Sequence, residues 1–162
     1  VPSQEDVLAL ALAAEELARE VYRRAVAARP FRGPWAAYLE AALAQEEEHA
    51  RRLREALGRQ PALRFRLPEV FQSPILLLRL LESLEEAFVG AYLGALPLLE
   101  GEALRLAGAI LGVEAGHRVL VRQARLELQD PLLRPPFVAN DRALEQALSP
   151  EGAREALKPY LP

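Results

Sequence analysis

The chain has 162 residues, of which 51% are hydrophobic, 27% charged and 6% aromatic, and its net charge at pH 7 is −3. This length favours one domain with its own core, and the acidic balance argues against nucleic-acid binding. Cysteine and methionine are absent, which excludes disulfides, thiolate metal sites, a cysteine nucleophile and thioether ligation. Leu, Ala, Glu and Arg number 32, 29, 20 and 19, and these strong helix formers predict an all-α fold.

Two amphipathic helices are predicted in the first part of the chain. The first is expected over residues 3–28, where Ser3 can cap its start with Asp6 three residues later. Prolines and a glycine interrupt the chain at 29–34, and a second helix is expected over 35–57. Because the break between them is short, the two helices should form an antiparallel hairpin.

A long segment without helical periodicity follows at residues 59–73 and contains Pro61 and Pro68. Extended, such a segment reaches roughly 50 Å, whereas a helix of the expected length is only about 36 Å long. It can therefore cross the whole bundle and leave the second and third helices parallel.

Two further helices are expected over 74–96 and 103–128, joined by a short turn. The sequence thus predicts a four-helix bundle over residues 1–128 with one long crossover between helices 2 and 3. The longest uncharged run, residues 87–99, is shorter than the ~20 residues that a bilayer requires, so no membrane insertion is expected.

Residues 129–162 form a proline-rich C-terminal extension with one short helix, capped by Ser149. We expect this extension to pack on the bundle within the same single domain. The side chains expected to anchor it are Leu132, Leu133, Phe137, Leu144, Leu148 and Leu157.

The only two histidines lie in the same sequence pattern. Glu46 precedes His49 by three residues, and Glu114 precedes His117 by three residues. Residues three apart share one face of a helix, so each pair can point to the same place. The two Glu-x2-His motifs are 68 residues apart, which indicates an internal repeat.

A Glu-x6-Tyr pair precedes each of these motifs. Glu15 is followed by Tyr22, and Glu85 is followed by Tyr92. Seven residues are two helical turns, so each tyrosine lies on the same face as its glutamate. The alternating order makes each helical hairpin one copy of a two-fold repeat.

These charged residues interrupt helical stripes that are otherwise apolar, so they should converge on the centre of the bundle. Buried carboxylates cost several kcal/mol each unless a cation compensates them. Carboxylates with two imidazoles suit two Fe or Mn ions, with Zn as an adventitious occupant, and leave open positions for dioxygen, peroxide or water. The predicted metal ligands are Glu15, Glu46, His49, Glu85, Glu114 and His117.

Within this set, Glu46 and Glu114 are the predicted bridging carboxylates, and the other two glutamates are terminal ligands. Tyr22 and Tyr92 would donate hydrogen bonds to carboxylates or supply electrons. Two alternatives stay open: Glu82 or Glu86 could replace Glu85 if the helix were rotated, or the bundle has lost its metals.

Glycines recur every four residues in the third and fourth helices, at Gly90, Gly94, Gly108, Gly112 and Gly116. Glycine costs about 1 kcal/mol in a helix interior, so these positions require a reason. Close approach of the third and fourth helices is the preferred explanation, and a dimer face is the alternative.

The whole pattern resembles the di-metal carboxylate proteins of the ferritin-like superfamily, which include rubrerythrins, bacterioferritins and manganese catalases. Residues 84–92 and 110–117, with 148–151 and 158–161, resemble more narrowly the ferritin-like domain proteins labelled desiccation-associated. The chain departs from rubrerythrins, which carry a four-cysteine module, and from bacterioferritins, which bind haem through methionine.

This resemblance implies an oxidoreductase that reacts with O2 or H2O2, either as a ferroxidase or in peroxide disposal. The alternative is a non-catalytic bundle for metal binding, iron storage or structural stress protection. A homodimer is compatible with either function. The resemblance and the missing initiator methionine favour an exported mature form, and the abundance of Arg and Pro suggests a thermophilic source.

Overall fold

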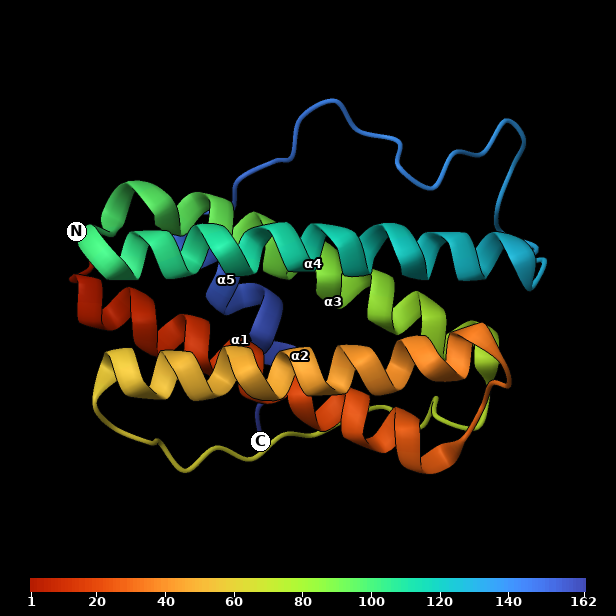
Figure 1. Cartoon of the computed structure of the whole chain (residues 1–162), viewed down its shortest axis with the longest axis horizontal. Helices are drawn as coiled ribbons and strands as arrows, with labels where there is room; N and C mark the ends of the chain where they lie inside the picture. Colours follow the sequence, from red (N-terminus) through yellow and green to blue (C-terminus); the bar gives the residue numbers. More distant parts are fainter.

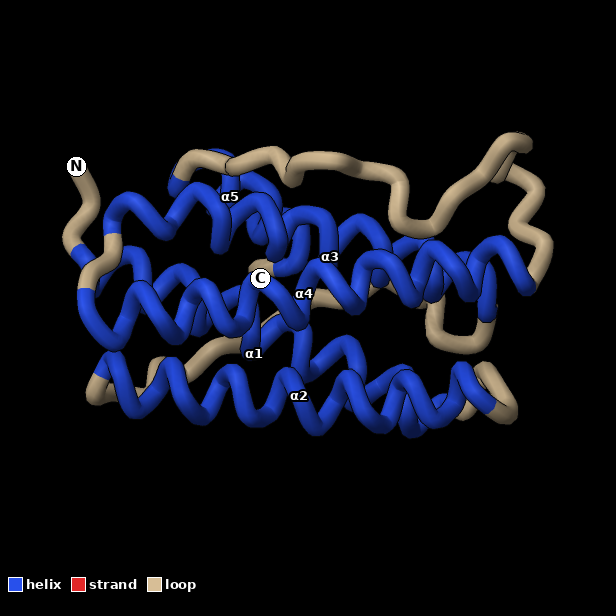
Figure 2. Tube along the Cα trace, turned by 45° about the horizontal axis from the view of Figure 1, so that its top comes forward, coloured by secondary structure: helices blue, strands red, loops and turns tan.

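The computed structural model describes residues 1–162 and contains helices but no strands (Figure 2). Its four long helices are α1 (Gln4–Ala28), α2 (Pro34–Leu57), α3 (Pro74–Ala95) and α4 (Gly101–Glu127). A short helix, α5 (Pro150–Leu157), lies across the bundle, and the 3-10 turns η1 (Leu96–Leu98) and η2 (Lys158–Tyr160) extend α3 and α5 (Figure 1). The predicted all-α bundle with a short C-terminal helix is therefore confirmed.

The helix ends follow local signals in the sequence. Ser3 and Asp6 form a reciprocal capping box at the start of α1, each side chain accepting a hydrogen bond from the other's backbone N–H. Gly58 ends α2 with φ 76°, a left-handed conformation that costs other residues energy because of their Cβ atom. The Ser149 hydroxyl caps α5 by accepting from the Gly152 N–H.

The crossover runs the length of the bundle, as its length predicts. It leaves the end of α2 and returns to the start of α3, so these two helices are parallel, while α1/α2 and α3/α4 are antiparallel hairpins (Figure 1). Phe71 buries its ring in the core, and the Arg66 N–H donates to the Tyr160 carbonyl at 2.7 Å. The crossover is therefore fastened both to the bundle and to the C-terminal end.

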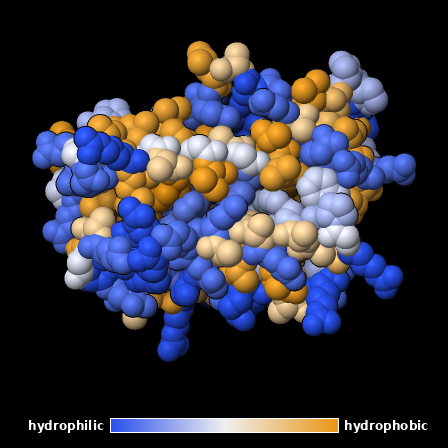
Figure 3. Space-filling model, viewed as in Figure 1, coloured by the Kyte–Doolittle hydropathy of each residue, from blue (hydrophilic) through white to orange (hydrophobic).

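The core consists of two apolar clusters with a polar layer between them. One contains Val21, Leu39 and Leu81, and the other contains Leu12 and Leu53. Burying each large aliphatic side chain contributes about 1.5–3 kcal/mol, which holds the four helices around the polar layer. On the face that Figure 3 shows, hydrophilic and hydrophobic residues are interleaved. No helix contains an uncharged apolar stretch of the length that a membrane span requires.

The extension after α4 returns along α3 and α4 before it enters α5 (Figure 1). The prediction that Leu132 and Leu144 anchor it is wrong, because these side chains are 61% and 84% exposed. Leu157, in α5, is buried as expected. The division of the chain at residue 128 stays a prediction.

Ion pairs hold the extension in place of those leucines. Arg79 and Arg125 bind Asp130, Arg118 and Arg122 bind Asp141, and Arg142 binds Glu86. The prediction for the two leucines failed because a segment without helical or strand periodicity has no regular apolar face. Which of its side chains are buried therefore does not follow from its sequence pattern.

The prediction that the glycines bring α3 and α4 together is also wrong. Gly90 and Gly94 face the extension instead, where the Leu148 N–H donates to the Gly90 carbonyl at 2.8 Å. A Cβ atom at Gly94 would lie 1.7 Å from the Leu148 carbonyl oxygen. The α4 glycines, such as Gly108, are exposed and have open space beside them. The alternative of a dimer face on α4 stays a prediction.

Gly94→Ala is expected to destabilise the protein by about 1–3 kcal/mol, because the added methyl group displaces the extension from α3. Gly108→Ala is the matched control and is expected to stabilise by about 0.5–1 kcal/mol, since its methyl meets open space in a helix interior. Urea unfolding measures both effects. Equal shifts in the two variants would contradict this account of the glycines.

Candidate metal centre

Six residues from four helices bring their side chains together in the polar layer, and each residue is at most 8% exposed. Each helical hairpin supplies three. They are Glu15 from α1, Glu46 and His49 from α2, Glu85 from α3, and Glu114 and His117 from α4. The structure thus brings together all six predicted ligands, although their role as ligands stays a prediction.

The six residues form two overlapping groups with ligand atoms within 4.8 Å of one another. One group comprises Glu15, Glu46, His49 and Glu114, and the other comprises Glu46, Glu85, Glu114 and His117. The two shared residues are the glutamates that precede the histidines. This arrangement can hold two ions with two carboxylates between them.

Each imidazole faces carboxylates through Nδ1. From His49 Nδ1, the distances are 3.0 Å to Glu114, 3.1 Å to Glu46 and 3.4 Å to Glu15. From His117 Nδ1, they are 3.2 Å to Glu46 and 3.5 Å to both Glu85 and Glu114. The donor atoms therefore converge from both hairpins on a small volume.

Unpaired polar atoms test whether these residues fit a metal. Seven buried side-chain nitrogen or oxygen atoms lack a hydrogen-bond partner, and six of them belong to this cluster. They are Glu15 Oε2, Glu46 Oε1, Glu85 Oε2, both carboxylate oxygens of Glu114, and His117 Nδ1. Buried polar atoms without partners are costly, and a set of carboxylate and imidazole donors left over in this way fits divalent cations.

The pKa values of the cluster also indicate that its carboxylates lack compensating positive charge. Burial, followed by the charge of Glu15, raises the pKa of Glu46 to about 8. Burial and the charge of Glu114 likewise raise the pKa of Glu85 to about 8. Burial lowers the pKa of His49, but the three carboxylates that face its Nδ1 outweigh this effect and raise that pKa to about 12. Protonation of these groups is therefore favoured, because it reduces the net negative charge that cations would otherwise compensate.

The two predicted tyrosines hydrogen-bond across the hairpins. The Tyr22 hydroxyl donates to Glu85 at 2.6 Å, and the Tyr92 hydroxyl donates to Glu15. Each tyrosine thus orients a glutamate of the other hairpin. Their assignment as catalytic residues stays a prediction.

Two further residues, which the sequence pattern did not single out, border the cluster. The Gln45 side chain lies 2.6 Å from His117 Nε2, and the Tyr38 hydroxyl lies 2.6 Å from that of Tyr22. When the Gln45 oxygen accepts from Nε2–H, Nδ1 of His117 is left free to bind a metal. Both residues lie beside the apolar stripe of α2, so only their contact with other helices reveals them.

Gln45→Leu is expected to weaken metal binding at the His117 half about 10–100-fold, because the imidazole loses the hydrogen bond that selects its tautomer. Isothermal titration of the metal-free variant with Mn(II) measures the loss. Gln123→Leu serves as the control, since Gln123 bonds only to Glu127. Identical affinities for the wild type and Gln45→Leu would contradict this role.

The glutamates considered as replacements for Glu85 lie elsewhere. Glu82 is buried but paired with Arg122 at 2.6 Å and with Arg125. Glu86 pairs with Arg142 in the extension. Their carboxylates are already neutralised by arginine, so neither belongs to the cluster.

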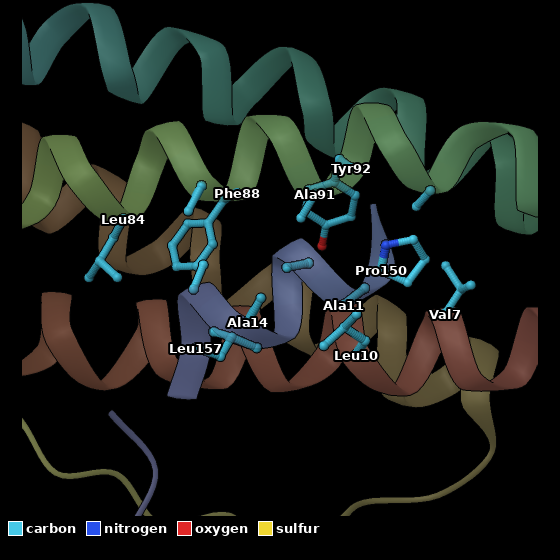
Figure 4. Close-up of a pocket in the computed structure, with 14 residues that line it drawn as sticks. Val7, Leu10, Ala11, Ala14, Leu84, Phe88, Ala91, Tyr92, Pro150 and Leu157 are labelled. Atoms are coloured by element: carbon cyan, nitrogen blue, oxygen red, sulfur yellow. The ribbon is translucent and has the colours of Figure 1, made fainter. Parts of the chain in front are cut away.

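An apolar pocket lies next to the cluster, between α1, α3 and α5, and Tyr92 forms part of its wall (Figure 4). Of its 14 lining residues, 13 are hydrophobic, and none is one of the six predicted ligands. The volume of the pocket is about 30 Å³. A water-sized molecule fits such a space, whereas an organic substrate does not. Because none of the six predicted ligands lines it, the pocket borders the cluster only through Tyr92.

Fold and site together define a helical bundle with a buried carboxylate and histidine cluster compatible with two metals. The sequence matches the ferritin-like domain family over residues 3–127, and the chain belongs to that family. The chain has no significant match among curated proteins. The narrower resemblance to desiccation-associated proteins stays a prediction.

Proposed function

We propose that this ferritin-like protein binds two redox-active ions, Fe or Mn, and acts as an oxidoreductase on O2 or H2O2. The observation that carries the proposal is the set of unpaired buried donor atoms that form two groups sharing Glu46 and Glu114. Without cations, the buried carboxylates would impose an unfavourable energy of several kcal/mol each.

The residues have distinct tasks in this function. Glu46 and Glu114 would bridge the ions, while each ion would take one histidine and one terminal glutamate, Glu15 or Glu85. When bound, two such ions can each exchange one electron, which suits the two-electron reduction of peroxide. Carboxylates accommodate this change of charge because they can shift between bridging and chelating modes.

The surroundings hold these ligands and limit access to them. Tyr22 and Tyr92 fix the terminal glutamates by hydrogen bonds, so these carboxylates keep their orientation. The apolar clusters on both sides of the polar layer exclude bulk water. A small oxidant is therefore the reactant that this site favours.

The resemblance to exported ferritin-like domain proteins also supports the proposal that the mature chain is exported.

Metal analysis of the native protein tests the proposal. We expect two ions per chain by inductively coupled plasma mass spectrometry. Fe(II)-loaded protein should consume O2 or H2O2 in stopped-flow experiments, or Mn-loaded protein should release O2 from H2O2. The absence of stoichiometric Fe and Mn would refute the site. Bound metal without turnover would identify the non-catalytic alternative.

A further inference from the structure

A chain of aromatic side chains leads from the surface to one half of the metal centre. Trp35, the only tryptophan, is partly exposed in the first turn of α2, and its indole N–H donates to Glu127 at 3.0 Å. Its ring lies 6.3 Å from the ring of Tyr38, edge to face. The start of α2 lies beside the end of α4 (Figure 1), so this entry point is at one end of the bundle.

The chain continues inward without a gap. The hydroxyls of Tyr38 and Tyr22 are 2.6 Å apart, and their rings are 6.1 Å apart. Both rings lie 5.9 Å from the ring of His117. The Tyr22 hydroxyl then donates to Glu85 at 2.6 Å. Three oxidisable side chains thus connect the surface to the Glu85 and His117 half of the site.

The other half of the repeat has no such chain. The offset of 68 residues places Ala103 and Leu106 at the positions of α4 that correspond to Trp35 and Tyr38. Tyr92 donates to Glu15 but forms no hydrogen bond to a second tyrosine. Core packing alone does not explain the aromatic residues of α2, because Ala103 and Leu106 fill the corresponding positions of α4 with aliphatic side chains.

We infer that Trp35 and Tyr38 carry electrons from a one-electron reductant in solution to the Glu85 and His117 half of the site. This inference rests on the proposed function, which supplies an oxidant, O2 or H2O2, at that site. It assigns a role to two residues outside the ligand set and its tyrosines. It also predicts that the two halves of the repeat differ in how fast they receive electrons.

Electrons and protons balance along this path. The site takes one electron from Tyr22, whose O–H bond breaks as the proton moves to Glu85 along the existing hydrogen bond. An electron from Trp35 passes through Tyr38 and reduces the Tyr22 radical, and the proton returns from Glu85. The external donor then reduces the Trp35 radical cation, whose N–H stays bonded to the Glu127 carboxylate. Two such electrons, with two protons taken up from the solvent, convert H2O2 to two molecules of water.

The path is first tested in the metal-free protein, independently of the proposed function. A flash-generated ruthenium(III) tris(bipyridine) complex oxidises Trp35, and transient absorption follows the conversion of the tryptophan radical to a tyrosyl radical. Tyr38→Phe is expected to slow this conversion about tenfold or more. Tyr160→Phe is the control, because Tyr160 is in η2 and its ring forms no aromatic pair with Trp35, Tyr38 or Tyr22. An unchanged rate in Tyr38→Phe would overturn the inference.

The inward direction is tested in the metal-loaded protein after reaction with H2O2. Freeze-quench electron paramagnetic resonance follows the decay of the tyrosyl radical when ascorbate is added. Trp35→Phe, checked for an unchanged metal content, is expected to slow that decay about tenfold. Decay at the wild-type rate would overturn the inference. A protein that passes the metal-free test but binds no metal would refute the proposed function and leave the conducting path in place.

Discussion

Glu114→Gln is expected to remove both metal ions from the protein. Glu114 belongs to both groups of donor atoms, and both of its oxygens lack hydrogen-bond partners. A neutral amide cannot bridge two cations, so we expect the affinity for each ion to fall at least about 100-fold. Mass spectrometric metal analysis and isothermal titration with Mn(II) measure the loss.

Glu82→Gln is the matched control for this variant. Glu82 is also a buried glutamate of the bundle, but its carboxylate is paired with Arg122 and Arg125. The change should reduce stability without altering the metal content. A Glu114→Gln protein that retains two ions per chain would place the metals elsewhere and refute the assigned ligand set.

Metal binding is expected to weaken steeply as the pH falls. Burial opposes protonation of His49 and His117, but the nearby carboxylates outweigh it, so the pKa of each imidazole is raised. Both imidazoles are therefore protonated in the metal-free protein at neutral pH, and both must lose a proton to bind metal. Releasing the two imidazole protons predicts a loss of at least about 100-fold in overall affinity for each unit of pH decrease.

Competition titrations with a chelator at pH 6, 7 and 8 measure this dependence. Proton release on adding metal in a weakly buffered solution provides an independent count. The carboxyls of Glu46 and Glu85, whose pKa values are both about 8, add to the release near neutral pH. An affinity that does not change between pH 6 and 8 would contradict the protonation of the site.

The bundle and the cluster could be predicted because both depend on helical period. Spacings of three and seven residues put Glu46 with His49, and Glu15 with Tyr22, on buried faces before any contact is known. The length of the crossover likewise limits the topology to a few possibilities. These features are local in the sequence, and the apolar stripes extend them to the whole bundle.

The remaining features depend on contacts between distant segments. Gln45 and Tyr38 acquire their roles only because α1 and α4 place Tyr22 and His117 beside them. Gly94 must be a glycine because the backbone of Leu148, more than fifty residues later, lies where a Cβ atom would be. Neither contact leaves a periodic signal in the chain, so spacing and composition could not predict it.

The exchange of hydrogen bonds between the hairpins has a consequence for how the centre fails. Tyr22 in the first hairpin orients Glu85 in the second, and Tyr92 in the second orients Glu15 in the first. Each hairpin also supplies one of the two shared glutamates, so neither can dissociate and keep a complete set of donors. Opening of either hairpin would therefore separate both groups of donor atoms together, so we expect metal binding to be an all-or-none property of the intact bundle.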